Sequence, residues 1–232
     1  MRDTLHDESI LDTATWAALT GPLAHLAVGD GDARGFLPDV CSFTAARDWH
    51  DPAVWSHIVT LVGPGGEFTL NPPDVALPPG WQTTFTLDGV QYVETPDVAA
   101  APDDEAVELG ADDVPEMLDL IERNQPGPFL PRTYLMGRYV GIRRDGVLVA
   151  MAGERMRPPG WTEISAVATD AAHRGQGLAA RLVLDVAHHI RQRGDHAYLH
   201  TAAGSPARAL YERLGFRVRR EVTFGTIQAP PA

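Results

Sequence analysis

The sequence predicts an α/β chain of the α+β kind, in which predicted strands and helices are interspersed along the chain. Short runs rich in alternating and β-branched residues are typical of strands. One long segment repeats apolar residues every four positions, which is typical of a helix, and a glycine-containing turn joins it to the strand before it. With 232 residues, 44% of them hydrophobic, the chain is long enough for one large or two small globular domains.

The charge and cysteine content exclude several classes of protein. The chain has 19 basic residues, all arginine, against 31 acidic residues and a net charge of -12, so we expect no nucleic-acid partner. Cys41 is the only cysteine, which excludes an internal disulfide and a cysteine-based zinc site. The acidic N-terminus does not resemble a signal peptide, and no apolar run approaches the roughly 18 residues of a membrane span. We therefore expect a cytoplasmic protein with no membrane partner.

A segment rich in proline, alanine and aspartate divides the chain. It has no helical or strand periodicity, so we interpret residues 96–104 as a linker. It separates an N-terminal α+β portion, residues 1–95, from a C-terminal domain, residues 105–232.

The N-terminal portion contains weaker signals. Asp51 and Pro52 are typical of a helix start, and Asp88-Gly89 is typical of a hairpin turn. The predicted elements are a helix at Pro52–Leu61, strands at Leu23–Val28, around Val40–Thr44 and at Glu67–Leu70, and a hairpin over Thr83–Val93.

The C-terminal domain has clearer periodicity. Leu178, Leu182, Val186 and Ile190 form one apolar helix face, and Gly215 suits a helix end. The predicted helices start near Asp112 and span Arg174–Arg193 and Pro206–Leu214; the predicted strands are Tyr139–Arg143, Val147–Met156, Thr162–Thr169, His196–His200 and Arg217–Phe224.

The stretch from Thr169 to Ala180, TDAAHRGQGLAA, carries the chemistry. Its two glycines allow backbone N–H groups to converge on one anion at a helix N-terminus, where the helix dipole also favours negative charge. A dinucleotide-binding loop would need a third glycine, and a P-loop would need a lysine that this chain lacks. The sequence therefore predicts a pyrophosphate site of another kind.

Two motifs at a characteristic separation identify a family resemblance. Arg174-x-x-Gly177-x-Ala179 resembles the acetyl-CoA signature of the GCN5-related N-acetyltransferases, and ARALYERLGF at 207–216 resembles their C-terminal A-x-x-L-Y-x-x-x-G-F. The resemblance extends over 107–224 and is closest to the FR47-like branch. It implies the fold of that family, a central mixed, mostly antiparallel sheet flanked by helices. It also implies acetyl-CoA as cosubstrate and direct acetyl transfer to a primary amine of a small molecule or peptide.

The resemblance also implies roles for individual residues. Tyr211 would donate a proton to the departing thiolate, and backbone groups at the end of one strand would hold the pantetheine arm. Nine arginines against three acidic residues between Ala171 and Arg220 suit a polyanionic cofactor. The expected cofactor-binding residues are Val167, Ala168, Thr169, Arg174, Gly175, Gln176, Gly177, Leu178, Ala179 and Ser205.

The general base and one cofactor contact are left open by the sequence. Glu163 is the first candidate to take the proton of the amine, directly or through water, and Glu154 is the second. Where the family often has an asparagine seven residues before the tyrosine, this chain has Gly204 followed by Ser205. Ser205 either replaces that contact or caps the following helix, and we favour the cap.

Several alternatives accompany this interpretation. His188, His189, His196 and His200 lack an acidic residue at a ligand spacing, so we expect no metal. The missing asparagine leaves a catalytically silent CoA-binding regulatory module as an alternative function. The N-terminal portion is either a degenerate copy of the same fold or a lid, and we expect a monomer or a homodimer. The sequence does not identify the acceptor.

Overall fold

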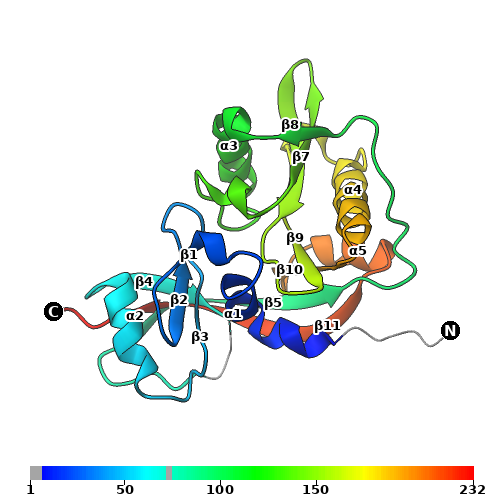
Figure 1. The fold of residues 1–232 in the computed structure, drawn as a ribbon. Coiled ribbons are helices and arrows are strands. Elements are labelled where there is room, and N and C mark those ends of the chain that lie inside the picture. The colour runs from blue at the N-terminus through cyan, green and yellow to red at the C-terminus, as the bar shows by residue number, and fades with distance from the viewer. Residues whose placement is uncertain (1–6, 72–74) are drawn as a thin grey trace.

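The computed structural model describes residues 7–71 and 75–232, and two sheets form the framework of that part (Figure 1). The larger sheet has the strand order β4-β11-β5-β10-β9-β8-β7-β6, and the smaller has the order β1-β2-β3. Only the β9–β10 pair within the larger sheet is parallel. The fold is therefore the predicted mixed, mostly antiparallel sheet flanked by helices.

The elements follow one another along the chain with these bounds. The helices are α1 Ala14–Leu19, α2 Val54–Val62, α3 Val114–Asn124, α4 Leu178–Gln192 and α5 Ala207–Arg213. The strands of the smaller sheet are β1 Ala27–Val28, β2 Ala33–Phe36 and β3 Thr44–Ala46. The strands of the larger sheet are β4 Glu67–Leu70, β5 Gln82–Val93, β6 Val107–Leu109, β7 Tyr139–Arg144, β8 Val147–Glu154, β9 Trp161–Thr169, β10 His196–Ala202 and β11 Arg217–Gln228.

Two different layers cover the two faces of the larger sheet. On one face the apolar stripe of α4 packs with Ala197 and Leu199 of β10. On the other face Tyr198 of β10 packs with residues near the N-terminus, among them Leu11 and Leu19. Because neighbouring strand residues point to opposite faces, β10 contributes to both cores.

The prediction of a hairpin at Asp88-Gly89 is wrong, because β5 is one continuous strand between β11 and β10. A two-residue hairpin turn needs positive φ, and Gly89 does not have it. A Cβ at Gly89 would lie 3.0 Å from the Thr201 carbonyl oxygen and 3.3 Å from the Phe224 ring. The glycine permits close packing between strands rather than a turn.

Two smaller expectations for the N-terminal portion are also corrected. Residues 24–26 form a 3₁₀ helix, and only Ala27–Val28 of the segment predicted as a strand is extended. Leu23 and Leu26 are both buried, a spacing of three that suits the tight helix rather than a strand. The strand expected around Val40 begins instead at Thr44.

Residues 96–104 contain no helix or strand, but hydrogen bonds and an ion pair connect them to side chains of α4. Val98 is buried, and its carbonyl oxygen accepts a hydrogen bond from Arg191 at 2.8 Å. Asp103 forms an ion pair with Arg181 at 2.6 Å, and its backbone N–H donates to Asp185 at 3.1 Å. This segment thus joins two parts of one sheet, because β4 and β5 precede it and pair with strands that follow it.

Candidate active site

The cleft in the larger sheet opens where its two parallel strands separate. The pairing of β9 with β10 ends at Ile164 and Leu199. Beyond that point a cavity of about 400 Å³ lies between the strands, lined by residues 163–167, 200–202 and Tyr211. A cleft at this place can admit an extended ligand between two strands that are no longer paired with each other.

A bulge in β9 lies in the wall of this cleft. Between Ser165 and Ala168 this strand has one residue more than β8 opposite, and Ala166 adopts a φ of 53°. A non-glycine residue in this region costs about 1–2 kcal/mol, and bulges interrupt the hydrogen-bond ladder and redirect backbone groups. No sequence pattern predicted this bulge, which contains Ala166 and Val167.

The predicted cofactor-arm residues have different environments. Val167 lines the cleft, whereas the Ala168 side chain is buried in the core under α3. The Thr169 hydroxyl is buried and has no hydrogen-bond partner in the described residues. Of the three, Val167 is therefore the one whose side chain reaches the cleft.

The glycine turn forms an open cradle at the start of α4. Gly175 and Gly177 both have a φ of 77°, and a Cβ on either would meet nothing within 4 Å. In the described part of the chain, no acceptor takes the backbone N–H groups of residues 175–177. These N–H groups, at the positive end of a 15-residue helix that begins at Leu178, can bind an anion.

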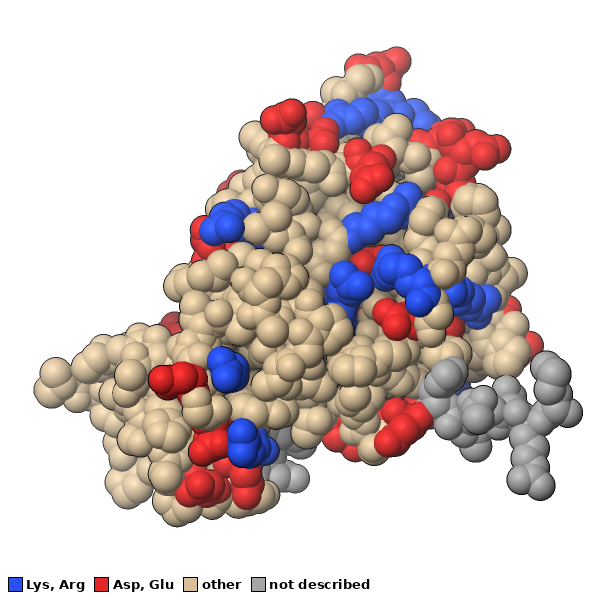
Figure 2. Space-filling model, in the orientation of Figure 1, with Lys and Arg blue, Asp and Glu red and all other residues tan. Residues whose placement is uncertain are grey.

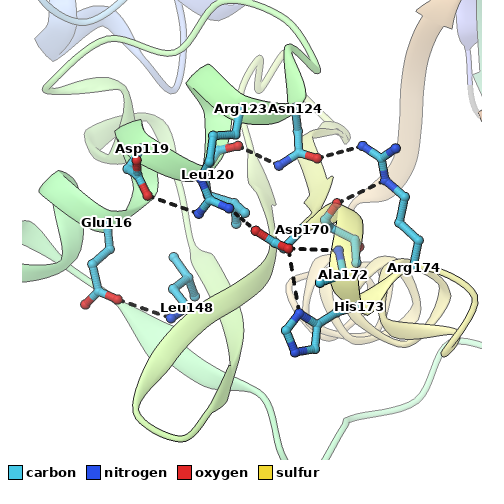
Figure 3. A network of polar contacts seen from close by, with 11 residues as sticks. Glu116, Asp119, Leu120, Arg123, Asn124, Leu148, Asp170, Ala172, His173 and Arg174 are labelled. Atoms are coloured by element: carbon cyan, nitrogen blue, oxygen red, sulfur yellow. Dashed lines mark hydrogen bonds and ion pairs between the residues drawn. The ribbon is translucent and has the colours of Figure 1, made fainter.

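Side chains of α3 hold this turn from the other side (Figure 3). Arg174 donates to the Asn124 side chain at 2.8 Å and to the Thr169 carbonyl oxygen at 3.4 Å. Asp170 accepts a hydrogen bond from the Ala172 N–H at 3.0 Å and pairs with Arg123. The Arg174 side chain thus anchors the turn to α3, while its neighbours' backbone N–H groups remain available.

Tyr211 lies on α5 and borders the cleft. Its side chain is 5% exposed, and burial, together with the nearby Tyr92, raises the pKa of the Tyr211 phenol to about 12. The phenol therefore stays protonated at neutral pH. Ser205 also lines the cleft, and its hydroxyl accepts the Ala207 N–H at 3.2 Å just before α5, whose N-cap position is occupied by Pro206.

Glu163 borders the cleft, but other side chains already engage its carboxylate. Arg155 donates to both oxygens at 2.9 and 2.7 Å, and the Nδ1 atom of His200 lies 2.8 Å from Oε1. Burial alone would raise the pKa of the Glu163 carboxyl, but the charge of Arg155 and the hydrogen bonds from His200 and Arg155 hold it well below its usual range. A carboxylate so stabilised is a weak base.

Glu154, the second candidate base, borders no part of the cleft. Its Oε1 atom pairs with Arg193 at 2.8 Å, and its Oε2 atom accepts the Arg138 N–H at 3.3 Å. Glu154 is 1% exposed, so its carboxylate holds the fold together rather than facing a ligand.

The sequence did not identify two polar residues beside Glu163. In the sequence, His200 belongs only to a histidine-rich patch, and Arg155 belongs to no motif. The alternation of β10 was the available signal, because it puts His200 on the same face as the buried Tyr198. The Nε2 atom of His200 lies 3.0 Å from the Gln91 side-chain nitrogen, and Arg219 donates to the Gln91 oxygen at 2.7 Å.

Surface charge, possible metal ligands and helix hydrophobicity were the other features that could indicate a different kind of site. In the face shown in Figure 2, blue and red side chains lie beside each other rather than forming one basic surface. Among the described residues, no group of three or more histidine, cysteine or acidic side chains is arranged to hold a metal ion. None of the helices in residues 7–71 and 75–232 is long and apolar enough to cross a membrane.

Comparisons with known proteins agree with this geometry. The family described as FR47-like protein matches residues 139–224, which contain β7 to most of β11. A GNAT-family protein from Novosphingobium aromaticivorans is 38% identical, with 96% of this chain and 99% of that chain covered and a TM-score of 0.86. No curated protein matches.

More distant structures share the fold. A GCN5-related N-acetyltransferase from Kribbella flavida is 22% identical over 95% of this chain and 96% of its own, with a TM-score of 0.61. A Drosophila protein is 15% identical over 86% of this chain and 74% of its own, with a TM-score of 0.65. Given the 38% identity over nearly all of both chains, this protein belongs to the GCN5-related N-acetyltransferase (GNAT) family, and its residues 139–224 are similar to FR47-like proteins.

Proposed function

We propose that the protein transfers the acetyl group of acetyl-CoA to a primary amine. The proposal depends on the presence of two features in one chain. These are the cradle of N–H groups before α4 and the cleft between β9 and β10, which Tyr211 borders. A cofactor with a pyrophosphate and a long thioester arm needs both. Family membership supports acetyl transfer in general.

In this proposal the donor binds mainly to backbone groups. The N–H groups of residues 174–179 hold the pyrophosphate, and the arm follows β9 toward the bulge. An N–H group near Val167 polarises the thioester carbonyl, and a single donor of this kind contributes roughly 3 kcal/mol to catalysis in other enzymes. The strained φ of Ala166 is consistent with a backbone shaped for this task.

The transfer itself is a direct displacement. The neutral amine nitrogen attacks the thioester carbonyl carbon, and the bond from that carbon to sulfur breaks. The departing thiolate takes the phenolic proton of Tyr211, which burial keeps in place at neutral pH. Solvent then restores the proton of Tyr211.

A base must accept the proton that the amine loses. We propose that this base is His200 and not Glu163. Glu163 accepts a hydrogen bond from Nδ1–H of His200 and so fixes the tautomer with a basic Nε2 atom. The Gln91 amide now occupies Nε2, so an entering amine must displace it. Glu163 is then a positioning residue, and its charge stabilises the imidazolium that forms.

The alternative is a CoA-binding module without catalysis. The engagement of both Glu163 oxygens by Arg155 favours it, because the carboxylate is not free. Release of free thiol from acetyl-CoA, measured with a panel of small primary amines, separates the two functions. Amine-dependent thiol release that is lost in Tyr211→Phe supports the enzyme. Tight CoA binding in calorimetry, with no amine-dependent release from any member of the panel, would contradict it.

A further inference from the structure

A second cavity lies next to the cleft, on the face of the sheet that the N-terminal portion covers. Its volume is about 430 Å³, and residues 11–16 and 43–50 form much of its wall. Five residues border both cavities: Phe43, Arg155, Glu163, His200 and Phe224. One layer of side chains thus separates the second cavity from the cleft.

Arg155 is a buried cation with unused hydrogen-bond donors at this boundary. It is 9% exposed, and its Nε and Nη2 atoms bind Glu163. In residues 7–71 and 75–232 no acceptor is bound to its Nη1 atom, and its guanidinium lies 5.1 Å from the centroid of the Phe43 ring. A guanidinium held side-on by one carboxylate leaves three N–H groups, two of them on Nη1, for another anion.

Arg220 is a second cation of the cavity wall that lacks full compensation. It shares the Asp12 carboxylate with Arg219, at 3.1 and 2.7 Å. Its Nε atom is buried without a partner among the described residues. Burial, with the adjacent Arg219, lowers the pKa of Arg220, which is the response expected of a cation short of negative charge.

Two of the three acidic residues of the wall are already engaged by cationic or imidazole side chains. Asp12 pairs with two arginines, Glu163 binds Arg155 and His200, and the Asp48 carboxylate accepts the His50 N–H at 2.9 Å. The spare donors of Arg155 and Arg220 are therefore available to an anion, while Asp48 and the buried Asn71 side-chain oxygen, which has no partner among the described residues, remain as acceptors in the same wall.

We propose that this cavity is the acceptor pocket and that its substrate is a small amine that also carries an anionic group, which Arg155 and Arg220 bind. The proposal rests on the proposed function, since it adds an acceptor to that reaction. Cavities of this size hold small molecules. The donor would come from the α4 face and the acceptor from the opposite face, with the amine at the shared layer beside His200.

Equilibrium binding tests the proposal without requiring turnover. The full-length protein is saturated with CoA and titrated by calorimetry with 4-aminobutyrate and its uncharged amide, and with phosphoethanolamine and ethanolamine. We expect each anionic amine to bind at least about tenfold more tightly than its neutral counterpart, equivalent to roughly 1.4 kcal/mol. The two pairs distinguish a carboxylate from a phosphate as the preferred group.

A matched pair of variants assigns the effect to this cavity. Arg220→Gln should abolish the preference for the anionic amine and leave CoA affinity unchanged, and Arg220→Lys should keep part of the preference. Arg217→Gln, on the same strand but outside the cavity wall, should keep all of it. If Arg220→Gln does not fold, the reduced preference in Arg220→Lys is the remaining test.

Two results would overturn the proposal. Equal binding of anionic and neutral amines, or no binding of any anionic amine, removes the anionic substrate class. A preference that survives in Arg220→Gln removes the cavity. An intact preference without any acetyl transfer would instead contradict the proposed function alone.

Discussion

The two faces of the larger sheet differ in how their sites are specified. On the α4 face, the cradle and Tyr211 come from two short motifs, 174–179 and 207–216, that can be read locally. On the opposite face, the cavity wall combines Phe43, Arg155 and His200, which are distant in the sequence and meet only in the folded chain. A motif can thus locate a common cofactor, whereas the specificity for the acceptor depends on tertiary packing.

Tyr211→Phe should produce one of the two largest effects, because it removes the proton donor on the α4 face of the sheet. Removing the proton donor should lower turnover by about 10²–10⁴-fold and leave CoA affinity nearly unchanged, because the hydroxyl acts on the thiolate. Steady-state kinetics with calorimetry of CoA binding measure both quantities. Unchanged turnover, with chemistry shown to limit the rate, would make Tyr211 a packing residue.

His200→Gln should lower turnover by a similar factor, about 10²–10⁴-fold, through a residue on the opposite face of the sheet. Glutamine can still bond to Glu163 but cannot take the proton. The pH dependence of kcat/KM distinguishes a base from a structural residue, because only loss of a base removes the acidic limb of the profile. A profile of unchanged form in His200→Gln would return the role of base to Glu163 or water.

Glu163→Gln should destabilise the fold, since it leaves Arg155 buried without its counter-charge. Loss of one partner of a buried pair costs about 3 kcal/mol or more. Because the folded-state pKa of Glu163 is below the ordinary 4.5, its stabilisation is complete above that value and is lost as the pH falls. Denaturant unfolding should show a large difference from the wild type at neutral pH and a smaller one near about pH 3. A constant difference would contradict the ion-pair account.

The sequence predicted the α4 face well because its signals are local. The strand at 162–169 and the helix at 206–214 are confirmed to within a few residues, and the turn before α4 contains the expected positive-φ glycines. The hairpin prediction at Gly89 was wrong because the requirement for glycine comes from strands β10 and β11, far along the chain. The Glu163–His200 contact was missed for the same reason, because 37 positions separate the two residues in the sequence.

Gly177→Trp should weaken CoA binding without unfolding the protein. The substitution adds bulk where the pyrophosphate would approach the backbone, and we expect affinity to fall about tenfold or more, equivalent to roughly 1.4 kcal/mol. Gly146→Trp is the matched control, because Gly146 also has positive φ and open space but lies in the β7–β8 turn. Equal CoA affinities in the two variants, measured by calorimetry, would refute the cradle.

Gly89→Ala should lower only the stability of the fold, by about 1–3 kcal/mol, because of crowding against Thr201 and Phe224. Gly110→Ala is the control, since a Cβ there meets nothing within 4 Å and its φ of -129° suits any residue. Thermal unfolding of both variants measures the difference. If the two variants are equally stable, the close approach of β10 and β11 to β5 does not explain the glycine.

A crystal structure of the protein with CoA bound tests most directly whether donor and acceptor bind on opposite faces of the larger sheet. The account predicts the pyrophosphate on the N–H groups of residues 174–179 and the thiol between Val167 and Tyr211, with the cavity of residues 11–16 and 43–50 left free for an acceptor. CoA lying in that cavity, or bound away from the turn before α4, would contradict it.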